Sequence, residues 1–381
     1  SSDLWLPEAG SEEANRLNKD IARHVKARFC LNEGTHYKYH DELEYASEAE
    51  KWLQMAATES DKLITSGRYE IYNTGHPQED YFNMYRIDDK SDLKEAVLYV
   101  DYKTNIREHN MAAAGREAGC GFSKSFVESF LCSDGLPISL SNKYLGDETM
   151  RKETANRDPR LKQLILTNDF PTNVTDDLKD STFVVNEDEF ITQHCFTGYR
   201  PIKGFNPIYS QALYMKSSFD GIAYRYAETL LINAEAKAEL NTITNADLDR
   251  TVNQLRDRVG MPHLTVNVGF TDPKWPDWGY SLSPVLQEIR RERCIELAGE
   301  GFRFNDLKRW KAGKLLNNVL TYVGKRKPDG NLAIVYPNYT NPDLSYQAGK
   351  SRTWEDKMYL YPIPTGELQR NPQLLPQNPG W

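Results

Sequence analysis

The sequence predicts a mainly α-helical fold of paired helices joined by long irregular loops. Apolar residues recur at helical spacing over residues 14–66 and again over residues 222–259. Between these regions, residues 103–218 are rich in Asp, Asn, Pro and Gly and show little periodicity. No linker-like stretch divides the chain, so we expect residues 1–381 to form one domain, with a C-terminal segment over about 283–381.

The first pair of predicted helices lies near the start of the chain. Residues 14–31 have an apolar side chain at every fourth position, and Gly34 follows as a stop signal. The stripe consists of Leu17, Ile21, Val25 and Phe29. Residues 47–66 form the second helix, which we expect Ser47 to cap.

A second pair of helices follows in the later part of the chain. Residues 222–240 carry the clearest helical stripe of apolar residues. Residues 246–259 form its partner, with Asn245 as the expected cap and Gly260 as the stop. Two antiparallel pairs of this kind, with small residues at their contacts, resemble tetratricopeptide-type hairpins.

Four shorter elements complete the predicted fold. Residues 95–102, EAVLYVDY, are largely apolar and predict a strand or an extended segment. Residues 122–130 predict a short helix. A Ser-Pro pair opens a helix over residues 283–298, and residues 304–311 predict one more helix.

Charge and composition exclude several classes of protein. With 55 acidic and 47 basic residues, a net charge of −8 and no basic tract, we expect no nucleic-acid partner. No apolar run approaches the roughly 20 residues that cross a bilayer. Phosphate-loop, dinucleotide-binding, zinc-protease and serine-hydrolase motifs are absent, so we expect no cofactor and no enzyme activity. The five cysteines are scattered, and whether Cys120 pairs with Cys132 stays open.

Several motifs occur in a fixed order along almost the whole chain. The most distinctive is RRERCIELAGEGFRFNDLKRW at residues 290–310, and the chain closes on YPIPTGEL and QNPGW. Earlier motifs are ARFCLNEGTHYKYH (27–40), an F…DG-x-P segment (126–137), RDPRL (157–161), YRYAETLLINAEAKAEL (224–240) and an N-x-x-R…GMP segment (253–262). This ordered set resembles the SusD/RagB family of nutrient-binding outer-membrane lipoproteins.

The resemblance implies a fold, a location and a role. Members of that family are lipid-anchored on the cell-surface face of the outer membrane of Bacteroidetes-type bacteria. They cover SusC-type TonB-dependent transporters and deliver oligosaccharides or, in some cases, peptides. We therefore expect a SusD-like fold and a non-catalytic binding subunit with a SusC-type partner. The match begins inside the family pattern, so we expect the lipid anchor and part of the ligand-facing surface to be absent from this chain.

The alternative function is a tetratricopeptide-type scaffold that binds protein partners and takes no small-molecule ligand. Such a scaffold would use a concave helical face as its binding surface, whereas a nutrient-binding subunit would use an aromatic loop surface.

A regular stripe of carboxylates raises the question of glycosidase chemistry. Four glutamates recur at every fourth position from Glu288 to Glu300, and glycosidases use paired carboxylates. Arginines are interleaved with them, and a neighbouring guanidinium lowers the pKa of a carboxyl group, which is wrong for a general acid. We therefore predict a structural ion network. Its members are Glu292, Arg293, Glu296, Glu300, Arg303, Asp306 and Arg309.

A pair of histidines is the only candidate for metal binding. His36 and His40 lie four residues apart, with two carboxylates nearby. The full set of ligands is missing, and the Gly-Thr pair at residues 34–35 indicates a loop or a helix start. We expect no bound metal.

Aromatic residues in the irregular segments are the candidate ligand-binding residues. A sugar offers apolar C–H faces and a rim of hydroxyls, so it binds a flat ring with polar neighbours. The candidates are Tyr199, Arg200, Phe205 and Tyr209 in one segment, Trp275 and Trp278 in a Pro-rich loop, and Tyr144. The alternative is that these rings anchor the loops onto the helices.

Overall fold

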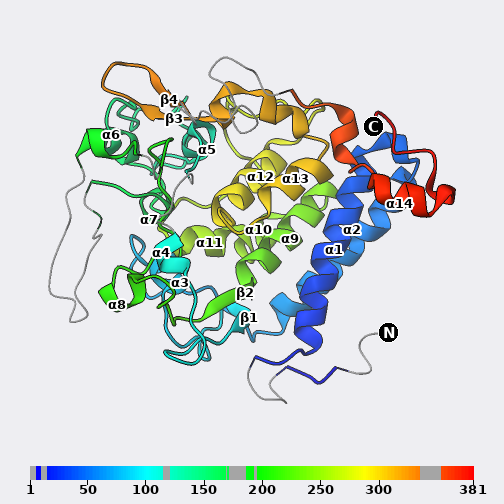
Figure 1. Ribbon diagram of the computed structural model, residues 1–381, viewed down its shortest axis with the longest axis horizontal. Helices are drawn as coiled ribbons and strands as arrows, with labels where there is room; N and C mark the ends of the chain where they lie inside the picture. The colour runs from blue at the N-terminus through cyan, green and yellow to red at the C-terminus, as the bar shows by residue number, and fades with distance from the viewer. Residues whose placement is uncertain are drawn as a thin grey trace.

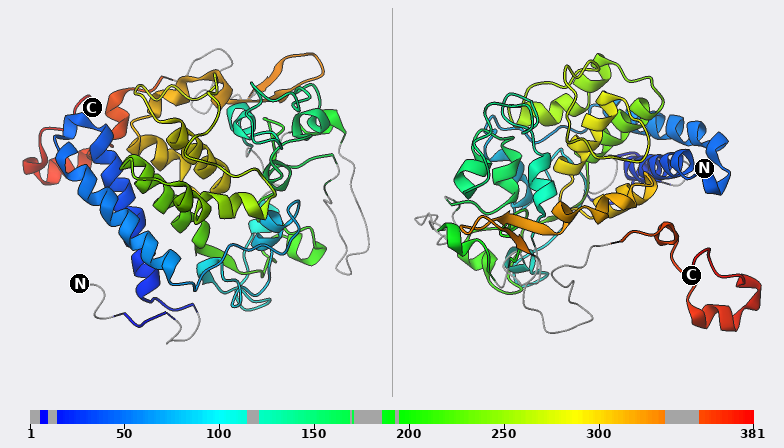
Figure 2. Two further views of the ribbon diagram at one scale, coloured as in Figure 1. Left: turned by 180° about the vertical axis from the view of Figure 1, so that it is seen from behind. Right: turned by 90° about the horizontal axis from the view of Figure 1, so that it is seen from above.

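The computed structural model describes residues 6–9, 15–114, 121–168, 170, 186–192, 195–334 and 353–381. The predicted helical class is correct, since helices dominate and the named strands of these residues form two short antiparallel pairs. The longest helices are α1 (Lys19–Tyr39), α2 (Ala49–Thr65), α9 (Tyr226–Glu239) and α12 (Pro284–Glu296). They lie in the centre and on one side of the molecule, and loops with short helices fill the other side (Figures 1 and 2).

We call these two parts the helical half and the loop-rich half. The helical half also contains α10 (Asn245–Asp249), α11 (Val252–Arg258) and α13 (Arg303–Arg309). The loop-rich half contains α3 (Asp80–Tyr85), α4 (Met111–Ala114), α5 (Lys124–Ser129), α6 (Met150–Thr154), α7 (Arg160–Leu164) and α8 (Tyr209–Ala212). The remaining elements are the strands β1 (Ala96–Val100), β2 (Gly221–Arg225), β3 (Val323–Arg326) and β4 (Leu332–Ile334), and the helix α14 (Thr365–Arg370).

The first helical pair, α1 and α2, differs from its prediction at two points. Helix α1 does not stop at Gly34, which is buried inside it. A Cβ atom on Gly34 would lie 2.8 Å from Cγ of Leu53, so this glycine lets α1 and α2 approach closely. The predicted Ser47 cap is also wrong, because a 3-10 turn precedes α2 and no side chain caps the helix.

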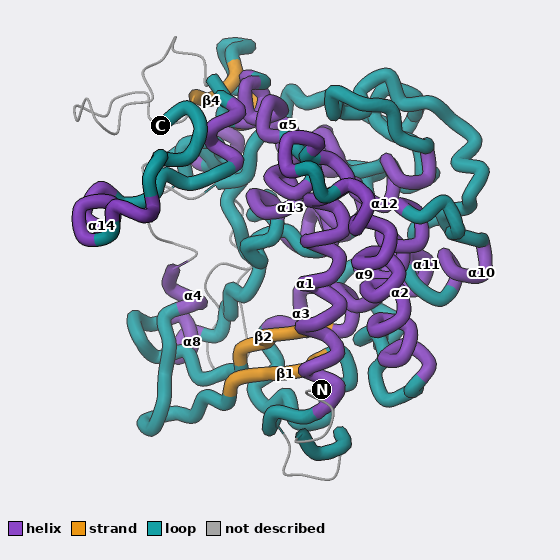
Figure 3. Tube along the Cα trace, turned by 90° about the vertical axis from the view of Figure 1, so that its right-hand side faces the viewer, coloured by secondary structure: helices purple, strands orange, loops and turns teal. Residues whose placement is uncertain are grey.

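The second helical pair is preceded by a strand that the sequence did not separate from it. Residues 221–225 form β2, which pairs antiparallel with β1, so the helix predicted over 222–240 begins only at Tyr226. The strand predicted over 95–102 is present as β1, and the sheet lies beside the N-terminal end of α1 (Figure 3). The helix predicted over 246–259 is divided into α10 and α11. Its cap is Thr244 rather than Asn245.

Helix α12 lies between the two halves and contributes to both cores. Ser283 caps it as predicted, because its hydroxyl accepts a hydrogen bond from the backbone N–H of Leu286 at 3.4 Å. Leu286 and Ile289 pack into the core of the helical half, against α9 and α11. Ile295 packs into a separate core that lies under the loops of the other half.

Four of the five cysteines lie within the described residues. Cys120 lies outside the described residues, so whether it pairs with Cys132 stays open. No disulfide joins any two of the cysteines within the described residues; these cysteines are Cys30, Cys132, Cys195 and Cys294. In the described ranges, no helix combines the length and the apolar character needed to cross a membrane.

Candidate functional site

The most heavily charged part of the interior surrounds Glu296 on α12. Its carboxylate accepts hydrogen bonds from Arg160, Arg225 and Arg258 at 2.6–3.0 Å, and all four side chains are buried. Burial alone would raise the pKa of Glu296, but the three guanidinium groups outweigh it and hold the pKa well below its usual value. Because the arginines come from α7, β2 and α11, this Glu296 cluster joins three distant segments to α12.

The same ion pairing continues to both sides along α12. Glu292 pairs with Arg160 at 2.5 Å and with Arg256 at 3.1 Å. Glu300 pairs with Lys203 at 2.6 Å and with Arg225 at 2.7 Å. Burial opposes ionisation of Glu300, yet Arg225 and Lys203 bring its pKa below the usual value. The carboxylate stripe therefore holds segments together, and the lowered pKa values of Glu296 and Glu300 are the opposite of what a general acid needs.

A second buried cluster centres on Glu235 of α9. Arg309 donates to both oxygens of Glu235, at 2.5 and 2.8 Å, and Trp310 Nε1 donates to one of them at 2.7 Å. Asp306 accepts from Arg293 and from Arg309, both at 2.9 Å. This cluster joins α9, α12 and α13.

Arg303 does not take the place that the sequence predicted for it. It is exposed at the start of α13, and among the described residues it forms no ion pair. Its guanidinium lies 5.9 Å from the ring of Trp310. The pattern of alternating charge predicted that Arg303 joins the ion network. This prediction is wrong, because the helix turns the side chain toward solvent.

The two histidines of the candidate metal site contact other groups of the fold. His40 contacts Glu42 at 2.8 Å and the backbone carbonyl of Lys308 at 2.8 Å, and its ring packs on His36 with 4.1 Å between centroids. Burial and the neighbouring His40 lower the pKa of His36 to about 4. Within the described ranges, no group of three or more His, Cys, Asp or Glu side chains is arranged to hold a metal ion.

Two of the aromatic candidates lie in the core of the loop-rich half. Tyr199 is 0% exposed, and its hydroxyl donates to Glu153 at 2.8 Å. Lys124 donates to the same hydroxyl at 3.3 Å. Phe205 is 7% exposed and packs in the same core. Neither ring has a free face for a ligand, which corresponds to the alternative that these rings anchor the loops.

The candidates of the Pro-rich loop are also packed against the helices. Trp278 is buried, donates to Gln287 at 2.6 Å and contacts Trp310 edge-on. Trp275 is half-buried, and its indole N–H donates to Glu288 at 2.7 Å. These bonds fix the loop to α12.

Apart from Tyr209, the two remaining candidates, Tyr144 and Arg200, are half-buried. The guanidinium of Arg157 lies 5.3 Å from the ring of Tyr144. The backbone carbonyl of Arg200 accepts from Leu166 at 2.8 Å. The seven predicted residues therefore do not converge on one site.

Tyr209 is the predicted residue that lies on the surface, with 57% of its side chain exposed. It begins α8, which lies next to α4 (Figures 1 and 3). Five more large apolar side chains, in residues 106–111 and 213–215, are exposed; they are Ile106, Met111, Leu213, Tyr214 and Met215. We call these six residues the loop patch. The sequence signal for the loop patch was the apolar run Leu213-Tyr214-Met215 within a polar stretch. The sequence-based prediction did not include this run.

The backbone beneath the loop patch is fixed by hydrogen bonds. His109 and Ser217 exchange backbone bonds of 2.9 and 3.1 Å, and the side chain of Asn110 accepts from the N–H of Met215 at 3.0 Å. The hydroxyls of Tyr209 and Tyr214 have no hydrogen-bond partner within the part of the chain that the structure describes. The backbone next to Tyr214 is thus held in place, and the hydroxyls of both tyrosines stay available.

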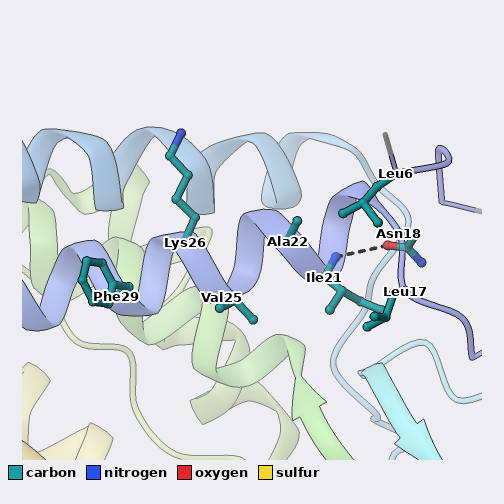
Figure 4. Close-up of a pocket in the computed structure, with 8 residues that line it drawn as sticks. All are labelled: Leu6, Leu17, Asn18, Ile21, Ala22, Val25, Lys26 and Phe29. Atoms are coloured by element: carbon teal, nitrogen blue, oxygen red, sulfur yellow. Dashed lines mark hydrogen bonds between the residues drawn. The ribbon is translucent and has the colours of Figure 1, made fainter. Parts of the chain in front are cut away.

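A different surface, on α1, is apolar and hollowed. A groove of about 490 Å³ runs along this helix and includes Leu6 from the preceding segment (Figure 4). Leu17 and Phe29 are 64% and 55% exposed within it. These are residues of the apolar stripe that predicted the helix, so part of that stripe faces outward.

Comparisons with known proteins agree on one family. The sequence profile of the SusD family matches residues 58–381. SusD-like protein P2 of Formosa agariphila is 33% identical over 166 residues, which are 44% of this chain and 27% of that protein.

Solved structures give the same result for the fold. A SusD-like protein from Bacteroides fragilis is 26% identical, with a TM-score of 0.66 over 99% of this chain and 68% of that chain. A SusD-like carbohydrate binding protein from the same species is 22% identical, with a TM-score of 0.63 over 97% of this chain and 67% of that chain. This chain thus corresponds to about two thirds of each solved chain, and its alignment covers about a quarter of the F. agariphila protein.

Proposed function

The chain belongs to the SusD family, and on that premise we propose that it is a non-catalytic binding subunit that captures glycans. The observation that carries the proposal is the loop patch, in which Tyr209 and Tyr214 are exposed on a fixed backbone. A tyrosine ring packs against the C–H face of a sugar, and its free hydroxyl can bond to a sugar hydroxyl. A B. fragilis relative of the same fold is described as a carbohydrate binding protein, which is consistent with this ligand class.

Three further candidate residues are half-buried and expose less side-chain surface than Tyr209 does. Arg200, Trp275 and Tyr144 each keep some exposed area and remain candidate ligand contacts. Tyr199, Phe205 and Trp278 do not take part, because their rings are buried.

The proposal of a non-catalytic role rests on the state of the carboxylates. Glu292 and Glu296 are buried against arginines, so neither can act as a glycosidase acid or nucleophile. Burial raises the pKa of Glu153, as a general acid would require, but that carboxyl group is fully buried and bonded to Lys124 and Tyr199. A substrate has no route of contact with it.

The partner and location follow from the family in the same way. We propose that the protein is lipid-anchored at the cell-surface face of the outer membrane and associates with a SusC-type TonB-dependent transporter. Peptides are the second ligand class that this role allows.

The experiment is calorimetric titration of the purified protein with neutral oligosaccharides, acidic oligosaccharides and short peptides. We expect one glycan class to bind, and we expect Tyr209→Ala/Tyr214→Ala to weaken that binding while the melting temperature is unchanged. Reducing-end release from the same glycans should not exceed that of heat-denatured protein. Binding of peptides alone, or hydrolysis above the denatured control, would overturn the proposal.

The second candidate function is a protein-interaction scaffold, which one observation favours. The α1 groove is lined by side chains at helical spacing and has an apolar surface, as a contact for another amphipathic helix would have. If this candidate is right, Phe29→Asp abolishes co-purification with the protein partner and leaves glycan binding intact.

A further inference from the structure

A pocket of about 430 Å³ lies where three helix ends meet. The C-terminal ends of α1 and α9 and the N-terminal end of α12 surround it. Its volume falls in the range of small-molecule pockets. The C-terminal end of α1 lies on the opposite side of the molecule from α8, so this pocket is separate from the loop patch (Figure 1).

Two tyrosines form the aromatic wall of the pocket. The rings of Tyr39 and Tyr280 stack with 4.4 Å between centroids and 19° between planes. The Tyr39 hydroxyl donates to Glu239 at 2.6 Å, and the Tyr280 hydroxyl donates to the backbone carbonyl of Trp310 at 2.5 Å. The buried side chain of Leu286 adds to the apolar lining. The wall is therefore rigid, and a ligand need not order it.

Three polar side chains in the lining have unused hydrogen-bonding capacity. The side chains of Asp41, Asn241 and Ser281 are exposed, and none has a hydrogen-bond or ion-pair partner among the described residues. Asn241 has φ 57°, a left-handed conformation that asparagine tolerates, which fixes its position directly after α9. A carboxylate, an amide and a hydroxyl together can both donate to and accept from a ligand that carries several hydroxyls.

The charges around the pocket balance. Lys38 lies in the lining and bonds to the carboxylate of Glu239 at 2.8 Å, and Arg290 bonds to the other oxygen of that carboxylate at 2.9 Å. The two cations, Lys38 and Arg290, are therefore matched by two anions, Glu239 and Asp41. An anionic or cationic ligand gains no net attraction here, so the pocket suits a neutral ligand with apolar and hydroxyl-bearing faces.

We propose that this pocket is a carbohydrate subsite that holds one neutral pyranose residue. Its apolar C–H groups contact Tyr39, Tyr280 and Leu286, and its hydroxyls bond to Asp41, Asn241 and Ser281. The inference rests on the proposed glycan-binding function, and it adds a second point of attachment on the helical half. Two separated weak sites raise the avidity of a multivalent glycan without a new contact at either one.

The test uses methyl pyranosides of glucose, galactose, mannose and xylose as probes, with NMR detection. At least one probe is expected to shift the side-chain amide signal of Asn241 in a saturable way. Asp41→Ala/Ser281→Ala removes two hydrogen-bond partners from exposed positions, so the fold is kept and the affinity of that probe falls about fivefold or more. Val319→Ala, at an exposed position outside both sites, is the control and leaves this affinity unchanged.

The outcomes separate the two proposals. If no pyranoside shifts Asn241 while longer glycans still bind at the loop patch, the subsite is wrong and the proposed function stands. A shift that the Asp41/Ser281 variant leaves unchanged also overturns the subsite. If the protein binds neither pyranosides nor any glycan, both proposals fail.

Discussion

The helical half and the loop-rich half are held together by different interactions. In the helical half, α9, α11 and α12 bury an apolar core whose residues recur at helical spacing. The loop-rich half has a core as well, but its short elements are tied to each other and to α12 by buried ions such as Lys124–Glu153 and Arg160–Glu296. Both halves bury ions, as the Glu235 cluster shows for the first, but among the described residues regular packing of long helices is found only in the first half.

Backbone carbonyls explain why the loops need these cations. Buried carbonyl groups without a helix or strand partner must find another donor. Arg157 donates to the carbonyls of Glu153, Val127 and Phe130 at 2.8–3.0 Å. Lys203 donates to the carbonyl of Ala298 at 2.7 Å. Long cationic side chains thus replace regular hydrogen bonding at these carbonyls.

The largest effect is expected from Glu296→Gln, which would break the attachment of the loop-rich half. The variant keeps the size of the side chain but leaves three buried arginines without their shared carboxylate. We expect a loss of about 3–5 kcal/mol in the free energy of unfolding, measured by urea denaturation. Glu50→Gln on the exposed surface of α2 is the control and should change stability by about 0.5 kcal/mol or less. Equal stability of the two variants would show that the cluster is not needed.

Gly34→Ala tests the packing of the helical half. Alanine is the better helix former by about 1 kcal/mol, but its Cβ would meet both the side chain and the backbone N of Leu53 within 3.0 Å. Overpacking of this kind costs about 1–3 kcal/mol, so we expect a net loss of roughly 1 kcal/mol. Gly366→Ala in α14, where no atom lies within 4 Å of the new Cβ, is the matched control and should be neutral or stabilising. Stabilisation by both substitutions would contradict the close approach.

The lowered pKa of His36 should make the stability of the protein depend on pH. Because burial lowers its pKa in the folded protein to about 4, the unfolded chain, with a pKa near 6.5, binds more protons between these values. The contribution of His36 to the free energy of unfolding is therefore fully present above pH 6.5 and is lost as the pH falls toward 4. When the free energy of unfolding is measured by chemical denaturation across that window, it should fall less steeply with decreasing pH for His36→Gln than for the unsubstituted protein. Parallel curves would refute the prediction.

The smallest effect on stability, and a selective effect on binding, is expected at the loop patch. Tyr214→Ala removes a side chain that is 74% exposed, so the free energy of unfolding should change by about 0.5 kcal/mol or less. Loss of one ring contact should weaken glycan binding about 2- to 10-fold, measured by calorimetry. Val319→Ala, an exposed apolar residue elsewhere, is the control for both quantities. A matching loss of affinity in both variants would argue against a specific role for Tyr214.

The comparison of the halves also explains how much the sequence could predict. The helices α1, α2 and α9 were predicted because an apolar stripe is a local and repeated signal, and α12 was predicted because a Ser-Pro pair marks a helix start. Gly34 was misread, because a glycine that permits close packing looks the same in sequence as one that ends a helix. The strand β2 was merged with α9, because its pairing with β1 is a contact between distant segments.

The ligand candidates were less predictable than the fold for a similar reason. Tyr199 and Tyr209 lie in the same irregular segment, and only the three-dimensional packing decides that one ring is buried and the other exposed. The stripe from Glu288 to Glu300 did indicate ion pairing. Its main partners, Arg160, Arg225 and Arg258, were not predicted, because they come from other parts of the chain.

The arrangement of the Glu296 cluster has a consequence for the order in which the chain folds during synthesis. Arg258, Arg225 and Arg160 precede Glu296 by 38, 71 and 136 residues, so all three arginines emerge before their common carboxylate. Until α12 is made, the loop-rich segments carry cations that cannot be buried without a large penalty. We therefore expect these segments to stay loosely attached while the ribosome advances, and to dock together once α12 appears. A helix near the end of the chain thus sets the time at which its middle becomes structured.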